Sequence, residues 1–515
     1  MPSPDRFDKK WIDEQLLPFP EPFRKAMLED YLTEPKSFNA NTNLRLTTAA
    51  VAKSLGSNPN LFSSIYKDED SLHNEAEYHS RNATKVKGKF LRYGNDAVYF
   101  ALSRYVTKLG VNAPKRKDSL VIKGHSPVTG LNERMCDKAW WLRSLRKRNL
   151  LRTEKAARQL NIVNKQKQIY VSDLIVESHR QQIARSRAML ESHVATNEVG
   201  YSATLAELSD LNVSNPTIRK AELNTRARGI EDLSISLGHQ GVFLTLTCPS
   251  KYHSSYGISG ERNPKWDGST PVDAQNYLTR TFSRIRAQLS REDIGIYGIR
   301  VVEPHHDGTP HWHLLLFVEP SQKDRMLEVF KQYCFEEDGD EEGADKYRFD
   351  VVLIDPSKGS ATGYIVKYIS KNIDGEDLDT DSYGEDAITS AQRVRAWASC
   401  FSIRQFQQIG GVSITVWREL RRLKEQLTLS ENAEEARMAT DGSEYGDFTQ
   451  IMGGVFCKRS EQLLRPFYDV AFDNNTGELK ESRYGDSFIK KLRGIKLGET
   501  EIITRVHQWS VAKSV

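Results

Sequence analysis

The most informative stretch of this sequence lies at residues 303–317 and reads EPHHDGTPHWHLLLF. Residues 307–310 within it, DGTP, are a turn signal. On either side of that turn, β-branched and apolar residues favour strands over 295–303 and 311–318. We therefore expect a β-hairpin, and the length of its connection decides which residues face each other.

Two imidazoles converge on one side of this hairpin. Because successive side chains of a strand point to opposite faces, His311 and His313 point the same way and Trp312 points into the opposite, apolar layer. Imidazole is a common metal ligand, so the pair predicts a metal site. Such a site needs a third ligand from a neighbouring strand.

The third ligand depends on the connection. If the loop has an odd number of residues, Glu303 lies opposite His313 and His305 lies opposite His311. An even loop supplies no ligand. We favour Glu303 over His305 or His306. Two imidazoles and a carboxylate leave open positions for water and a substrate oxygen, as a Lewis-acid site requires, but non-haem iron oxygenases use the same set. The cluster alone leaves both chemistries open.

A helix expected over residues 360–371 favours a Lewis-acid site over a non-haem iron oxygenase. Its spacing places Tyr364, Tyr368 and Lys371 at positions i, i+4 and i+7 on one face. A phenol, with a pKa of about 10, attacks a phosphodiester poorly unless a cation polarises the phosphate and positive charge assists the tyrosine. The metal pair and Lys371 provide both. The hairpin and helix together indicate strand cleavage by tyrosine.

The hydrophobic periodicity divides the chain into three regions. Residues 1–240 read as mainly helical. Residues 241–400 read as an α+β domain with a central antiparallel sheet and flanking helices. Residues 401–515 read as a helical C-terminal region with a polar linker near 430–447.

Further elements are expected inside the α+β domain. Strands are predicted at 242–247 and 349–354, and a helix at 323–333. Two acidic stretches, 336–350 and 374–386, predict solvated loops.

A basic segment lies in the N-terminal region. Between Lys138 and Lys167 there are ten Lys or Arg residues and one acid, and Trp140 and Trp141 stand among them. Cations beside aromatic rings suit phosphate contacts and base stacking, whereas a solvated helix face is the alternative. We expect DNA binding here, through Arg143, Arg146, Lys147 and Arg148.

Composition narrows the class of protein. The chain has 515 residues, and its formal charge is only +4 from 73 basic and 69 acidic side chains. Its five cysteines are scattered without a CxxC pair, which argues against a disulfide framework or a cysteine zinc site. Neither a signal peptide, a membrane-spanning stretch nor a GxxxxGK[ST] nucleotide motif is recognised. An intracellular protein without its own ATP-driven unwinding is expected.

Three blocks of sequence resemble the HUH endonucleases, specifically the phage gene A replication-initiation family (phage GPA). They are FLTLTCPSKYH at 243–253, EPHHDGTPHWH at 303–313 and YIVKYISK at 364–371. The resemblance implies a central HUH-type antiparallel sheet. It covers residues 240–375 firmly and the helical region before them more loosely.

The resemblance also implies roles. His311 and His313 would hold Mg²⁺ or Mn²⁺, with Glu303 as the less secure third ligand. Tyr364 and Tyr368 would be alternating nucleophiles, and Lys371 would contact the scissile phosphate or orient a phenol.

The implied reaction nicks one strand of origin DNA that is single-stranded or locally melted. It leaves a 5′-phosphotyrosine and a free 3′-hydroxyl, which a host DNA polymerase extends behind a host helicase in the cytoplasm of a bacterium. The alternatives are a two-tyrosine transposase, a plasmid replication initiator, and a DNA-binding protein that holds a structural metal.

Overall fold

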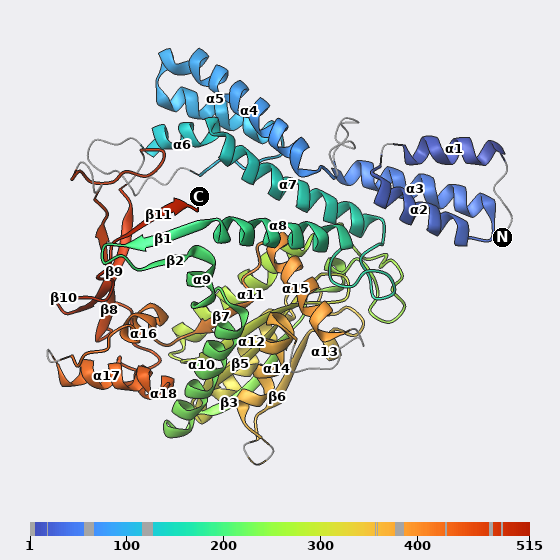
Figure 1. The fold of residues 1–515 in the computed structure, drawn as a ribbon. Helices are drawn as coiled ribbons and strands as arrows, with labels where there is room; N and C mark the ends of the chain where they lie inside the picture. Colours follow the sequence, from blue (N-terminus) through green and yellow to red (C-terminus); the bar gives the residue numbers. More distant parts are fainter. Residues whose placement is uncertain are drawn as a thin grey trace. The chain divides into compact units, whose positions relative to one another are not determined.

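The structure is a computed structural model, and Figure 1 gives the order of its elements. It describes residues 6–17, 19–55, 66–115, 127–355, 357, 359–375, 386–427, 430–472, 477–485 and 488–514. The chain forms two compact units. One comprises Met1–Leu160 and Tyr468–Leu492, and the other comprises Asn161–Phe467 and Arg493–Val515.

These two units do not coincide with the three regions expected from the hydrophobic periodicity. The structural division falls at Leu160, not near residue 240, and a C-terminal segment joins the first unit. The functional division at 240 and 400 stays a prediction.

The first unit is mainly helical, as predicted. Asp68 begins α4 by accepting the backbone N–H of Ser71 at 2.7 Å, and Asp137 caps α7 in the same way. Apolar faces of α4, α5 and α7 bury Leu102 and Trp141 in a common core. The helices are α1 (Arg6–Leu16), α2 (Glu21–Thr33), α3 (Ser37–Leu55), α4 (Glu69–Phe90), η2 (Leu91–Tyr93), α5 (Asn95–Lys108), α6 (Pro127–Cys136) and α7 (Lys138–Gln159).

A five-stranded antiparallel sheet forms the centre of the second unit, and its order is β6-β3-β5-β4-β7. The four strands expected from sequence are present. The edge strand β7 is an addition, too short and too polar to be recognised. The strands are β3 (Gln240–Leu246), β4 (Tyr297–Pro304), β5 (Pro310–Val318), β6 (Phe349–Leu353) and β7 (Phe406–Ile409).

Helices cover both faces of this sheet. On one face lie α10 (Pro216–Ser236) and α14 (Ala361–Ile373), and on the other lie α11 (Pro271–Arg291) and α12 (Lys323–Cys334). Phe243 and Ile365 belong to the core on the α14 side. Trp312 packs edge to face against Phe282 of α11, with ring centroids 5.7 Å apart. The alternation predicted for β5 and the α+β class are therefore confirmed.

The hairpin has an odd connection, as expected, but its register differs by two residues. Residues 305–309 join the strands, and Glu303 lies opposite His311 rather than His313. His305 lies in the connection and not opposite His311. Because the shift is an even number, Glu303 still shares one face of the sheet with both histidines.

The reason for this register is a side chain inside the turn. The buried carboxylate of Asp307 accepts the backbone N–H groups of Thr309 at 3.0 Å and Ser254 at 2.7 Å. Gly308 follows with φ +80°, and a Cβ there would lie 2.6 Å from the carbonyl oxygen of Tyr170. These contacts centre the turn on Asp307.

Beyond the sheet, several predictions need correction. The stretch 430–447 is not a linker, because it forms most of α17 and α18, whose Ala433, Tyr445 and Phe448 are fully buried. After residue 460 the chain forms strands rather than helices, and β11 pairs with β1. The remaining elements are α8 (Asp173–Glu191), β1 (His193–Asn197), β2 (Ser202–Thr204), α9 (Leu205–Asp210), η3 (Ser250–Tyr252), η4 (Pro320–Gln322), α13 (Ala344–Tyr347), α15 (Ala387–Phe401), α16 (Ile414–Leu420), α17 (Glu431–Asp441), α18 (Tyr445–Ile451), β8 (Leu464–Val470), β9 (Lys490–Leu497), β10 (Thr500–Ile503) and β11 (Trp509–Lys513).

The structure describes the first acidic stretch, 336–350, in full and the second, 374–386, only at its two ends. The first is partly structured, since α13 lies within it and Glu341 accepts the backbone N–H of Ser250 at 3.0 Å. Most of the second, residues 376–385, lies outside the described residues. Among the helices that are described, none is long and apolar enough to cross a membrane.

Candidate active site

Two imidazoles meet on the α14 side of β5. Nε2 of His311 lies 2.8 Å from Nε2 of His313, and the ring planes are almost perpendicular, at 89°. Both nitrogens therefore face one small volume. Burial, helped by the nearby rings of His305 and His313, holds the pKa of His311 well below its usual value. The neutral ring that results is the form that binds a metal ion.

Glu303 is the third candidate ligand. Its Oε2 lies 3.3 Å from Nε2 of His313 and 4.0 Å from Nε2 of His311. All three ligand atoms lie within 4.8 Å of one another. Burial alone would raise the pKa of Glu303, but Lys371, His313 and Asn372 together outweigh it and hold that pKa below its usual value. Two imidazoles and one ionised carboxylate fit a divalent cation.

Other side chains hold these ligands in place. Asn372 donates from Nδ2 to Oε1 of Glu303 at 2.6 Å, while its own Oδ1 accepts from Nε2 of Gln405 at 3.0 Å. The hydroxyl of Thr245 lies 3.2 Å from Nδ1 of His313. A ligating histidine commonly uses its second nitrogen in this way, which leaves Nε2 for the metal.

The tyrosine-bearing helix packs directly on this cluster. The ring of Tyr368 stacks on His313, with centroids 4.0 Å apart and planes at 28°. Phe243 of β3 contacts Tyr368 at 5.5 Å and Tyr364 at 5.9 Å, so both phenols border the same ring. Burial, followed by the carboxylates of Glu303 and Asp350, raises the pKa of Tyr368 to about 12. This phenol keeps its proton at neutral pH until positive charge approaches it.

Lys371 completes the arrangement, because its Nζ lies 3.5 Å from Oε2 of Glu303. The structure therefore brings together Glu303, His311, His313, Tyr364, Tyr368 and Lys371. Sequence reasoning missed Thr245, Asn372 and Gln405. Thr245 sits opposite His313 on the neighbouring strand, and Asn372 lies one turn after Tyr368, so both could have been found from spacing. Nothing in the sequence signals Gln405.

Charged contacts from α10 hold α14 at both ends. The carboxylate of Glu231 accepts the backbone N–H groups of Ala361 at 2.5 Å and Thr362 at 2.9 Å. At the other end, Nζ of Lys220 lies 3.0 Å from Oδ1 of Asp374, and both side chains are largely buried. An anion at a helix N-terminus and a cation at its C-terminus are the favourable arrangement. Helix α10 thereby fixes where the tyrosines stand over the sheet.

Replacing Glu231 with alanine is expected to lower the free energy of unfolding by about 1 to 2 kcal/mol, because two N–H groups lose their acceptor. DNA attachment should fall as well, since α14 is then less firmly placed. Glu231→Gln retains an acceptor oxygen and should keep part of both. Thermal unfolding and the yield of covalent protein–DNA product measure the two effects. Lower stability with an unchanged yield would contradict the positioning role.

The residues expected to bind DNA lie on α7 in the first unit, and they divide into two groups. Arg143 and Lys147 are exposed and stay candidates. Arg148 is not one, because its side chain is buried, donates to Oε1 of Glu75 at 2.6 Å and also bonds the carbonyl of Leu109. Arg146 is partly exposed and pairs with Glu69.

Base stacking by the tryptophans also needs correction. Trp141 is fully buried, and its Nε1 donates to the carbonyl of Met135 at 2.8 Å. Trp140 packs against the same core. These rings stabilise the helical unit, and α7 offers cations alone as its candidate DNA contacts.

A matched pair of variants separates the two kinds of cation on α7. Arg148→Ala should lower the free energy of unfolding by about 2 kcal/mol, because Glu75 loses a buried charged partner. Lys147→Ala should change stability by less than about 0.5 kcal/mol and should weaken DNA binding, with a salt slope smaller by about 0.7 to 0.9. Chemical denaturation and DNA titrations at several salt concentrations check both. Equal effects of the two variants on stability would disprove the distinction.

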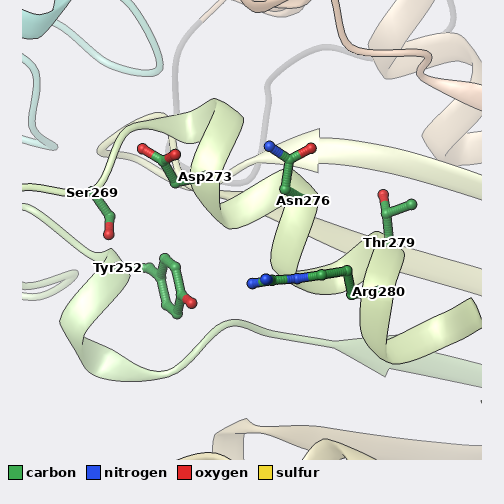
Figure 2. Close-up of a pocket in the computed structure, with 6 residues that line it drawn as sticks. All are labelled: Tyr252, Ser269, Asp273, Asn276, Thr279 and Arg280. Carbon is green, nitrogen blue, oxygen red and sulfur yellow. The ribbon is translucent and has the colours of Figure 1, made fainter. Parts of the chain in front are cut away.

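A cavity of about 520 Å³ lies away from this cluster (Figure 2). Four of its lining residues belong to α11, which covers the opposite face of the sheet, and Arg280 extends toward Tyr252. None of the metal-binding or tyrosine residues lines it. Its lining residues are Tyr252, Ser269, Asp273, Asn276, Thr279 and Arg280. The candidate active site is therefore the cluster on the α14 side.

The fold and the site define a class of protein, an α+β domain in which two histidines and a glutamate on a hairpin face a helix with two tyrosines. The profile of the bacteriophage replication gene A protein (GPA) family matches residues 70–376. The chain belongs to this family, as its three sequence blocks predict.

Individual relatives agree with this assignment. The chain is 41% identical over 390 residues to the replication gene A protein of Escherichia phage 186, covering 73% of this chain and 55% of that protein. It is 37% identical to the probable replication protein P12 of Pseudoalteromonas phage PM2, over 73% of this chain and 58% of the relative.

A third relative carries an enzymatic name. The chain is 33% identical to a probable replication endonuclease from a prophage-like region of Salmonella typhimurium, over 74% of this chain and 49% of the relative. The matches thus span about half the length of these relatives. No solved structure gives a significant match.

Proposed function

We propose that this chain is a site-specific, metal-dependent single-strand DNA endonuclease and strand transferase that initiates phage rolling-circle replication. The observation that carries the proposal is the stacking of Tyr368 on His313 at 4.0 Å. This contact joins a nucleophile to a ligand of the candidate cation site. The printed names of the relatives, replication gene A protein and probable replication endonuclease, support a nuclease that acts in DNA replication.

Each group in the cluster has a task in this reaction. Bound by Glu303, His311 and His313, Mg²⁺ or Mn²⁺ would supply Lewis-acid polarisation of a phosphate oxygen. Tyr364 and Tyr368 provide the attacking hydroxyls. Asn372 and Thr245 hold the ligands, while Phe243 supports both phenol rings.

The tyrosine oxygen attacks the phosphorus of one phosphodiester. A bond forms between the phenolic oxygen and phosphorus, and the bond between phosphorus and the 3′-oxygen breaks. The proton lost by the phenol is balanced by the proton gained by the 3′-oxygen. Positive charge from Lys371, which lies 3.5 Å from Glu303, stabilises the phenolate and the charge on the phosphate.

The product is a 5′-phosphotyrosine and a free 3′-hydroxyl. Since phenolate is a good leaving group, a later 3′-hydroxyl can attack the same phosphorus and rejoin the strand without ATP. Tyr364 and Tyr368 are four residues apart, about 6 Å along the helix axis. One tyrosine can therefore hold a DNA end while the other cleaves again.

The proposed substrate is origin DNA, single-stranded or locally melted. Exposed cations such as Arg143 and Lys147 would add contacts to its backbone. The released 3′-hydroxyl is the primer for a host DNA polymerase, and a host helicase separates the strands.

Covalent capture from a random pool tests this proposal. Purified chain is incubated with Mg²⁺ and labelled single-stranded oligonucleotides of random sequence, then separated on a denaturing gel and sequenced. We expect label to remain on the protein with Mg²⁺ and not with EDTA, and the captured DNA to share one sequence. A transposon-end sequence would instead indicate a two-tyrosine transposase, and a plasmid origin a plasmid initiator. DNA binding without any covalent product would leave a binding protein with a structural metal.

A further inference from the structure

His305 is a partly buried imidazole that the proposed reaction does not use. It leads the connection between β4 and β5, and its ring lies edge to face against His311, with centroids 4.1 Å apart. Within the described part of the chain, Nε2 of His305 is buried and makes no hydrogen bond. The same is true of Nδ1 of His311. Two unsatisfied nitrogens therefore belong to rings in contact, one able to accept and one able to donate.

The other metal-ligand candidate differs in this respect. Nδ1 of His313 lies 3.2 Å from the hydroxyl of Thr245, so its second nitrogen has a partner. Ligating histidines almost always give their second N–H to a fixed acceptor, which sets the tautomer and the direction of the ring. For His311, a ring in contact with it, His305, carries an unsatisfied nitrogen of its own. A buried donor left without an acceptor loses its hydrogen bonds to water and gains none in return, so such a pair is strongly favoured to close.

We propose that His305 is a positioning residue, whose Nε2 accepts a hydrogen bond from Nδ1 of His311 and so directs Nε2 of His311 to the metal. The proposal rests on the proposed function, since it assumes a cation at Glu303, His311 and His313.

A series of contacts behind His305 fixes its own orientation. The ring of His253 meets His305 edge to face at 5.1 Å, and Nδ1 of His253 lies 3.5 Å from Oδ1 of Asp307. Asp307 is fully buried and also accepts hydrogen bonds from Ser254 and Thr309. Three imidazoles thus lead from the metal site to one rigid carboxylate. His253 is therefore part of this support.

The neighbouring histidine gives a matched control. His306 adjoins His305 in sequence, but its Nε2 bonds the carbonyl oxygen of Ser255 at 3.1 Å. It is more deeply buried than His305, and its ring nitrogen is engaged by a backbone carbonyl rather than left unsatisfied. If His305→Leu weakened Mn²⁺ binding only by disturbing the turn, His306→Leu should weaken Mn²⁺ binding as well.

Calorimetric titration of the full chain with Mn²⁺ and no DNA tests the proposal. We expect His305→Leu to bind Mn²⁺ about 10- to 100-fold more weakly than the wild type. His305→Gln retains an acceptor oxygen and should recover part of the affinity, and His306→Leu should bind as the wild type does. Wild-type affinity in His305→Leu, or equal weakening in His305→Leu and His305→Gln, would overturn the proposal.

A second measurement avoids substitution, in case a variant does not fold. In a long-range ¹H–¹⁵N spectrum of metal-free protein with labelled histidines, His311 should carry its proton on Nδ1. A proton on Nε2 would overturn the proposal. These measurements can fail independently of the test of the proposed function. Normal Mn²⁺ binding without covalent DNA product refutes the function alone, and covalent product with unaltered Mn²⁺ binding in His305→Leu refutes the role of His305 alone.

Discussion

Replacing His311 or His313 with alanine should slow DNA cleavage by at least about 100-fold, because the cation that polarises the phosphate loses a ligand. Glu303 and the one remaining imidazole cannot hold a divalent ion in the open geometry required. His311→Ala should change stability by less than about 1 kcal/mol, and His313→Ala should cost more, because His313 is buried and stacks on Phe243 and Tyr368. Covalent capture with Mg²⁺, together with chemical denaturation, measures the two effects side by side.

A histidine at the opposite end of the same sheet provides the control. His239 precedes β3, and its Nδ1 lies 2.9 Å from the hydroxyl of Tyr297. His239→Ala should leave cleavage near the wild-type rate. Should His311→Ala or His313→Ala retain Mg²⁺-dependent nicking at that rate, the metal assignment is wrong.

Removing both phenolic hydroxyls, as Tyr364→Phe with Tyr368→Phe, should eliminate covalent attachment of DNA. Phenylalanine keeps the ring contacts with Phe243 and His313, so the fold and Mn²⁺ binding should be preserved. Either single variant should still cleave single-stranded oligonucleotides, because the remaining tyrosine lies one turn away. Complete cut-and-rejoin cycles should require both.

The matched control is Tyr347→Phe, which removes a hydroxyl from an exposed ring outside the site. It should leave attachment unchanged. A double variant that still forms the covalent product would refute the tyrosine mechanism. A single variant that completes repeated cycles at the normal rate would refute alternation.

The parts of the site that follow from periodicity were predictable from sequence. Alternation along β5 placed His311 and His313 on one face of the sheet, and the helical repeat placed Tyr364 and Tyr368 on one face of α14. Both patterns depend on residues close together in the chain. The turn signal at 307–310 predicted that β4 pairs with β5, which places Glu303 near His311 and His313.

What depends on distant contacts was not predictable. Asp307 shifts the hairpin register through bonds to Ser254 and Thr309, and Gln405 reaches Glu303 only through Asn372. Neither effect has a local signature in the sequence.

The same holds for burial. Charge counting could not distinguish the exposed Lys147 from Arg148, whose partner Glu75 lies 73 residues earlier. Helix α17 was not predicted because its buried residues are mostly alanines among charged residues. Small side chains give a weak hydrophobic pattern.

Mass spectrometry of the covalent protein–DNA product tests the central claim most directly. Trypsin cleaves after Lys367 and so separates the two tyrosines into peptides 359–367 and 368–371. With Mg²⁺ and captured DNA, we predict a nucleotide attached through phosphate to Tyr364 or Tyr368, and no such peptide in EDTA. Attachment to a residue outside these two peptides, or cleavage without any attached nucleotide, would contradict the account.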